Sequence, residues 1–148
     1  MKYIKYLILL LIIIFLTYLI ILQKNKTLST VNIKIATQNY SFEIARSILE
    51  KSQGLSHRSS LCQNCGMIFV FDQQDYYPFW MKDTKIPLDM IWLDQNNKIV
   101  TITTASPQDG QKTFINDKPA KYVIELNAGI TQRLDLKIGD TINIPQKL

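Results

Sequence analysis

Residues 66–92 read GMIFVFDQQDYYPFWMKDTKIPLDMIW, and this stretch decides the fold. Two aromatic-rich runs, each suited to a protein interior, bracket the charged residues Lys82, Asp83 and Asp89. Charged side chains are seldom fully buried unless they are paired. The stretch therefore contains either a polar cluster that binds a ligand or ionic residues that only stabilise a small fold.

The rest of the C-terminal part alternates between apolar and polar residues with a period of two, which indicates strands. VNIKIA (31–36) and YSFEIA (40–45) alternate in this way, and MIFVF and YYPFWMK are expected to form two strands around a turn at 72–75. LDMIWLD, KIVTITT, KYVIEL and a final strand TINI follow. Seven or eight short strands predict a mainly β domain with a β-sandwich or barrel-like architecture.

One short helix interrupts this pattern. Ser47 and Glu50 have the spacing of a capping box, in which each side chain bonds the backbone N–H of the other residue. Gly54 stands where a residue just past a helix end belongs. The sequence predicts a helix over about 48–53 and a single helical turn near 131–134.

The N-terminus is a separate segment, residues 1–27, followed by one domain over 28–148. Residues 6–22 read YLILLLIIIFLTYLIIL, without a charge, and lysines flank this run. A bilayer-spanning helix needs about 17–25 apolar residues, so we expect a signal-anchor that spans the membrane once. A cleaved signal peptide is the alternative, but its apolar region is usually shorter and ends in a small-residue cleavage site. The short N-terminal tail predicts a domain that faces the periplasm or the cell exterior.

The net charge of +5 does not indicate nucleic-acid binding. Four of the 17 basic residues flank the apolar run at positions 2, 5, 24 and 26. The remaining 13 basic residues and all 12 acidic residues lie within 27–148, so that part has a net charge of about +1. Nucleic-acid binders usually present a basic face, so we expect no nucleic-acid partner.

The cluster around Lys82 has two interpretations. On an edge strand, lysine prevents unwanted strand pairing, Asp83 caps a turn and Asp89 begins the next strand. Alternatively, Trp80 is the wall of a pocket in which Lys82 and the two carboxylates meet a polar ligand, because such sites combine aromatic walls with a few polar groups.

Cys62 and Cys65 form a C-x-x-C pattern just before an expected strand. A redox-active pair usually lies at a helix N-terminus, and a metal site would need His57 and a further ligand. A local disulfide or two inert thiols fits better, and export favours the disulfide. No metal or other cofactor is expected.

Several motifs resemble domain-of-unknown-function family 192. The resemblance spans about 33–145, and its most specific element is FWMK-x-T-x-IPLDM-x-W-x-D at 79–94. Further elements are GM-x-F-x-F at 66–71, YV-x-EL-x-AG at 122–129 and Gly54-Leu55 with Arg58. It implies a compact, mainly β domain, often exported or membrane-anchored, with no agreed activity. It also implies that Lys82, Asp89, Arg58 and Glu125 are family features, whereas Asp83 replaces a common asparagine.

Our first hypothesis is an uncharacterised, non-enzymatic binding module for a polar ligand, such as a glycan or an envelope component. No residue is assigned a catalytic role. The alternatives are an enzyme that uses Cys62 and Cys65 for thiol–disulfide exchange, or for metal-assisted hydrolysis with His57, and a purely structural domain. The candidate ligand-binding residues are Arg58, Trp80, Lys82, Asp83, Asp89 and Glu125.

Overall fold

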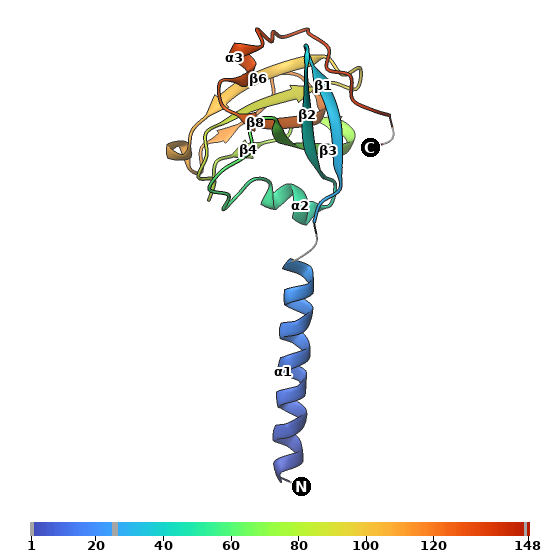
Figure 1. Ribbon diagram of the computed structural model, residues 1–148, viewed down its shortest axis with the longest axis vertical. Helices are drawn as coiled ribbons and strands as arrows, with labels where there is room; N and C mark the ends of the chain where they lie inside the picture. Colours follow the sequence, from blue (N-terminus) through green and yellow to red (C-terminus); the bar gives the residue numbers. More distant parts are fainter. Residues whose placement is uncertain (1, 25–26, 147) are drawn as a thin grey trace.

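The computed structural model describes residues 2–24, 27–146 and 148. A helix, α1 (Lys2–Lys24), precedes a β-rich part and lies apart from its sheet (Figure 1). The strands are β1 (Thr30–Ile35), β2 (Gln38–Ala45), β3 (Cys65–Asp75), β4 (Phe79–Trp80), β5 (Leu88–Leu93), β6 (Ile99–Ala105), β7 (Thr113–Phe114) and β8 (Ala120–Asn127). The shorter helices are α2 (Ile48–Gln53), the 3-10 turn η1 (Pro107–Asp109) and α3 (Ile130–Arg133).

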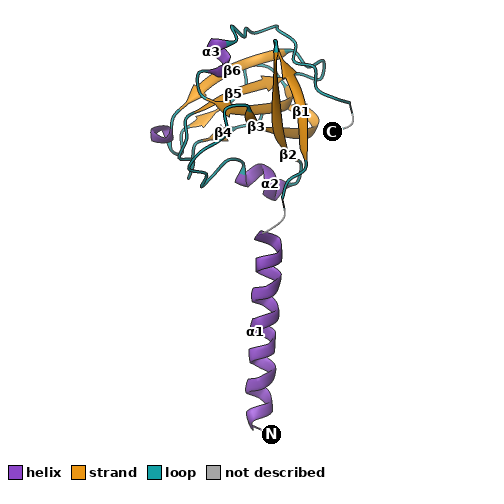
Figure 2. Ribbon diagram, in the orientation of Figure 1, coloured by secondary structure: helices purple, strands orange, loops and turns teal. Residues whose placement is uncertain are grey.

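Six strands form one sheet in the order β1-β2-β3-β8-β5-β6 (Figure 2). Neighbours are antiparallel except β2 and β3, which are parallel and are connected through α2. The strand β8 lies between β3 and β5, although it comes late in the sequence. The strands β4 and β7 form a separate two-stranded sheet.

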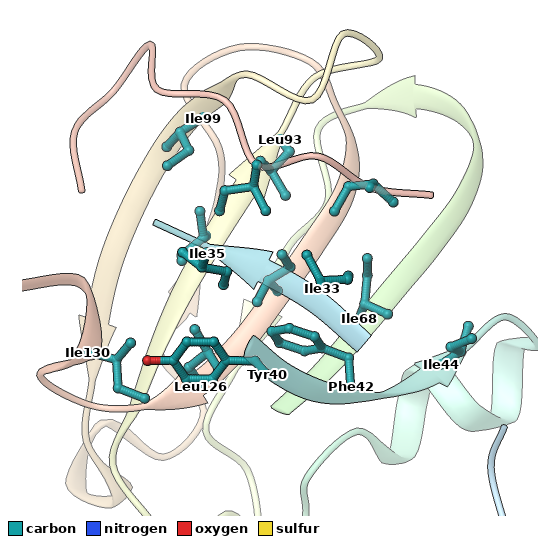
Figure 3. Close-up of a cluster of buried hydrophobic side chains, with 14 residues drawn as sticks. Ile33, Ile35, Tyr40, Phe42, Ile44, Ile68, Leu93, Ile99, Leu126 and Ile130 are labelled. Carbon is teal, nitrogen blue, oxygen red and sulfur yellow. The ribbon is translucent and has the colours of Figure 1, made fainter. Parts of the chain in front are cut away.

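Both faces of the six-stranded sheet are covered, and all six residues of β5 are buried. Neighbouring residues on a strand point to opposite faces, so we name the faces after Ile68 and Phe69 of β3. The Ile68 face packs against isoleucines that follow β8, and Figure 3 shows this cluster around Tyr40 and Phe42. The Phe69 face packs against residues from the α2–β3 connection and the segment after β3, among them Leu55 and Met81.

The helix α2 begins as the capping box predicts. Ser47 Oγ accepts a hydrogen bond from the Glu50 N–H at 3.2 Å, and Glu50 Oε2 accepts one from the Ser47 N–H at 2.9 Å. The helix ends at Gly54, whose φ of +50° suits glycine. This local prediction is confirmed.

The predicted β-sandwich or barrel with one short helix is wrong, although the mainly β composition is confirmed. One six-stranded sheet buries both faces, and α3 and η1 add helical turns. Residues 72–75 are the end of β3 and not a turn. The expected strand TINI makes only an isolated bridge between Lys98 and Thr141.

The predicted transmembrane helix over 6–22 is also wrong. Among the described residues, no helix combines the length and the apolar character that a membrane span requires. The side chains of residues 20–22 lie outside the described residues.

Candidate functional site

A cleft of about 240 Å³ opens on the Phe69 face of the sheet. Strands β3 and β8 contribute its floor, while α2 with the turn after it and the segment 77–84 contribute the sides. The lining residues are Lys51, Ser52, Gln53, Gly54, Leu55, Ser56, Phe69, Phe71, Tyr77, Pro78, Phe79, Trp80, Thr84 and Glu125.

Aromatic side chains give the cleft a fixed wall. The rings of Phe71 and Tyr77 stack with centroids 3.5 Å apart, and Phe79 packs edge-on against Phe69 with centroids 4.8 Å apart. The edge-on arrangement of Phe69 and Phe79 is a preferred one for aromatic pairs and helps to hold both rings in place. Trp80 lies at the opening and remains 49% exposed, so its indole can contact a ligand without rearrangement of the core.

Glu125 is the one acidic residue in the lining. It belongs to β8, where the sheet register sets it beside Met67 of β3 and Met90 of β5. Its side chain is buried, and Oε2 has no hydrogen-bond partner among the described residues. Buried polar groups in native proteins are almost always hydrogen-bonded. An unpartnered carboxyl oxygen inside a cleft therefore indicates a place where a ligand or water supplies the missing bond.

Burial in apolar surroundings raises the pKa of Glu125 to about 8, because the charged form loses its hydration. The positive charge of Arg58 acts in the opposite direction but does not overcome this effect. At neutral pH most Glu125 side chains are therefore protonated. A neutral carboxylic acid can both donate and accept a hydrogen bond, which a carboxylate cannot do.

Arg58 is held beside the cleft and not in its lining. Its Nη1 and Nη2 donate to the two carboxylate oxygens of Glu43 at 2.5 and 2.7 Å. This bidentate bond raises the pKa of Arg58 against the opposing effect of desolvation. No hydrogen bond joins Arg58 to Glu125 in the described structure, so Arg58 influences Glu125 through its charge.

Gly54 lies next to the buried carboxyl group of Glu125. A Cβ atom at this position would lie 3.3 Å from Phe69 Cζ and 3.9 Å from Glu125 Oε2. Any side chain here would therefore narrow the space over the carboxyl group. The glycine that ends α2 therefore lets the helix end pack closely against Phe69 and the Glu125 carboxyl group.

Asp89 lies on the other face of the sheet and has a complete set of partners. Its Oδ1 accepts a hydrogen bond from Thr104 Oγ1 at 2.7 Å. Its Oδ2 accepts from the backbone N–H and the hydroxyl of Thr131 at 2.8 and 2.9 Å. These bonds tie β5 to β6 and to the start of α3, which is a structural role.

Lys82 and Asp83 are exposed and lie outside the lining of the cleft. Their backbone carbonyls accept hydrogen bonds from the loop after α2, from Ser56 Oγ to Lys82 and from the His57 N–H to Asp83. Asp83 has a φ of +57°, a left-handed conformation that Asp tolerates. Of the six candidates, the structure thus brings Trp80 and Glu125 into the cleft and Arg58 beside it.

Cys62 and Cys65 are joined by a disulfide. The amide of Asn127 donates to the carbonyls of Leu61 and Cys62, which fixes this loop against the end of β8. Among the described residues, no three His, Cys, Asp or Glu side chains are grouped as metal ligands. The backbone N–H of His57 donates a hydrogen bond to the Asp83 carbonyl, and His57 has a φ of +65°.

Sequence reasoning missed the aromatic wall residues Phe71 and Tyr77 and the rim lysine Lys51. Phe71 and Tyr77 lie on either side of residues 72–75, whose polar sequence predicts a turn and gives no sign that the two rings stack. Lys51 follows Glu50 in α2 and donates from Nζ to the Val70 carbonyl at 3.0 Å. A lysine inside a short helix gives no sequence signal for such a contact.

The comparisons with known proteins agree with this fold. The chain is 31% identical over 55 residues to UPF0127 protein PF1050 of Pyrococcus furiosus and 34% identical over 55 residues to UPF0127 protein PYRAB11210 of Pyrococcus abyssi. These alignments cover 37% of the chain and 45% and 44% of the two relatives. The chain therefore matches less than half the length of these curated relatives.

Two solved structures are similar over most of their length. A protein from Sinorhizobium meliloti, described as a proposed transcription regulator, has a TM-score of 0.74 and 30% identity, with coverage of 80% of this chain and 96% of that one. A protein of unknown function from Novosphingobium aromaticivorans has a TM-score of 0.69 and 29% identity, with coverage of 78% and 84%.

The profile of DUF192, "Uncharacterized ACR", matches residues 30–144. This match spans almost the whole β-rich part, and the chain belongs to the DUF192 family.

Proposed function

We propose that this DUF192 domain is a binding module for a small polar ligand, such as a glycan or another envelope component, and that the Glu125 cleft is its binding site. The unpartnered Oε2 of Glu125 inside an open, aromatic-lined cleft carries this proposal. A ligand that donates or accepts a hydrogen bond there removes the cost of an unsatisfied buried group, which is about 1–3 kcal/mol.

The aromatic wall supports a ligand with an apolar face and polar edges. Small-molecule sites combine mainly hydrophobic and aromatic lining with a few polar groups that set orientation. Trp80 at the opening offers a flat apolar surface, and Glu125 at the base offers the polar contact. A sugar ring has this combination, because its C–H face is apolar and its hydroxyls lie around the edge.

We place the domain outside the cytoplasm, in the periplasm or at the cell exterior. The disulfide between Cys62 and Cys65 supports this location, because disulfides persist in oxidising compartments and are rare in the cytosol. An envelope ligand would be available there.

The test uses the full chain and a panel of oligosaccharides and envelope fragments, with binding measured by calorimetry. Trp80→Ala is expected to weaken binding at least tenfold with little change in stability, because Trp80 is 49% exposed. Tyr76→Ala is the matched control, since Tyr76 is 50% exposed but absent from the lining. Equal loss in both variants, or no binding to any member of the panel, would refute the proposal.

A further inference from the structure

Neither cation near the cleft forms a hydrogen bond with Glu125. Arg58 uses Nη1 and Nη2 for the two oxygens of Glu43. The Lys51 ammonium donates to the Val70 carbonyl and lies 4.5 Å from the centroid of the Phe71 ring. Arg58 and Lys51 therefore bond other acceptors, and Oε2 of Glu125 has no partner within the described residues.

The other groups that face Glu125 are uncharged near neutral pH or already paired. Met67 and Met90 flank it on β3 and β5, and Glu43 on β2 belongs to the Arg58 pair. Tyr77 lines the same cleft, and burial with the nearby acidic residues raises its pKa above the usual 10. Glu125 is thus the group in the lining whose charge changes between neutral and mildly alkaline pH.

We propose that Glu125 binds as a neutral carboxylic acid, with one hydrogen bond donated to and one accepted from two neighbouring hydroxyls of an uncharged sugar. This inference rests on the proposed function and names the ligand class of the same site. The carboxylic O–H and C=O lie side by side, and a pair of adjacent ring hydroxyls presents an acceptor beside a donor in the same way.

Charged sugars fit the cleft less well. An amino sugar in its ammonium form meets the Lys51 charge at the rim, and like charges repel. A uronic acid would bring a second carboxyl group next to a buried one, and two such groups cannot both ionise without a large cost. An uncharged sugar adds no charge to a site in which the available cations are engaged.

Ionisation of Glu125 removes the donor, so binding of the neutral sugar weakens as the carboxyl group loses its proton. With a pKa of about 8 in the free protein, the apparent affinity falls about tenfold between pH 7 and pH 9, because only the protonated form binds. An ammonium-bearing ligand would behave in the opposite way, since it favours the carboxylate.

The experiment measures binding by the full chain at pH 6, 7, 8 and 9. The probes are N-acetylglucosamine oligomers and cello-oligosaccharides as neutral sugars, glucosamine oligomers at pH 6, where their amines are protonated, as cations, and oligogalacturonate as an anion. Glu125→Gln keeps a donor and an acceptor but does not titrate, so it is expected to bind neutral sugars equally at pH 7 and pH 9. Glu125→Met matches the neighbouring methionines in size and is expected to fold but to lose binding at least tenfold.

Each outcome is decisive. A tenfold alkaline loss in the wild-type chain, abolished in Glu125→Gln, supports the inference. Stronger binding of the glucosamine oligomers, or a neutral-sugar affinity independent of pH, overturns the inference while the proposed function stands. Failure of every probe overturns both. An NMR titration of the Glu125 carboxyl group in the ligand-free chain is expected to show ionisation near pH 8. Ionisation near pH 4.5 would overturn the inference as well.

Discussion

Asp89 of β5 and Glu125 of β8 project from opposite faces of the sheet. Glu125 is in register with Met90, so Asp89, one residue earlier, points the other way. Both carboxyl groups are buried, but Asp89 accepts three hydrogen bonds whereas Glu125 Oε2 accepts none within the described structure. The two acidic residues therefore differ in their surroundings: Asp89 is hydrogen-bonded within the fold, and Glu125 lines the cleft.

The stability of the protein should depend on pH through Glu125. The folded state holds the Glu125 proton up to about pH 8, whereas the unfolded chain releases it near pH 4.5. The folded state therefore binds more protons in this window, and the free energy of unfolding falls as pH rises through it, by on the order of a few kcal/mol. Urea denaturation at pH 5, 7 and 9 measures this slope.

Glu125→Gln should remove most of that slope and be more stable than the wild type at pH 9. The matched control is Asp72→Asn, which neutralises an exposed carboxylate on the same sheet. It should retain the wild-type dependence on pH. An unchanged slope in Glu125→Gln would show that other groups cause it.

Asp89→Ala should strongly destabilise the fold without a direct effect on the cleft. The substitution leaves the hydroxyls of Thr104 and Thr131 and the Thr131 N–H without their acceptor. Hydrogen bonds to a charged group contribute about 1.5–3 kcal/mol each, so we expect the removal of these three bonds to cost at least roughly 4.5 kcal/mol. Chemical denaturation measures the loss, and Thr104→Val, which removes only one bond, should lose clearly less.

Gly66→Ala should also destabilise the protein, because the sheet leaves no room for a side chain. A Cβ atom would lie 2.5 Å from Phe42 Cε1 and 2.6 Å from the carbonyl oxygen of Glu125. Overpacking usually costs about 1–3 kcal/mol, and a backbone neighbour cannot move aside easily. In Gly110→Ala the new atom meets nothing within 4 Å, although φ is +54°. With a ψ of −112°, Gly110 lies outside the left-handed helical region, and backbone strain alone should cost about 1–3 kcal/mol in this control. A Gly66→Ala variant with the melting temperature of the wild type would contradict the packing argument.

Replacement of both Cys62 and Cys65 by serine should reduce stability only slightly. The two residues are three positions apart, and for such a short loop the chain-entropy estimate is about 2 kcal/mol at most. Thermal denaturation with and without reductant measures the effect. Turnover of a dithiol substrate by the wild type, lost in the double variant, would instead support a thiol–disulfide oxidoreductase.

Local features of the fold were predictable where neighbouring residues determine them. The capping box of Ser47 and Glu50 fixed the start of α2, and Gly54 fixed its end. The expected turn at 131–134 corresponds to α3. Each depends on bonds between residues a few positions apart, so the sequence pattern contains the required information.

Features that depend on distant partners could not be predicted in this way. The register of β8 between β3 and β5 decides that Glu125 faces the cleft and that Asp89 does not. The polar residues 72–75 suggested a turn, but β8 pairs with Asp75 and extends β3 past an irregularity. Strand pairing across the chain, and not alternation within one strand, determines these outcomes.

The late position of β8 has a consequence for how a nascent chain acquires its structure. The strands β1–β3 and β5–β6 become neighbours only when residues 120–127 insert between them. Contacts between distant parts of a chain form slowly, because a long loop must close before they can stabilise it. During synthesis, the edges of β3 and β5 that pair with β8 therefore remain open until residues 120–127 are available.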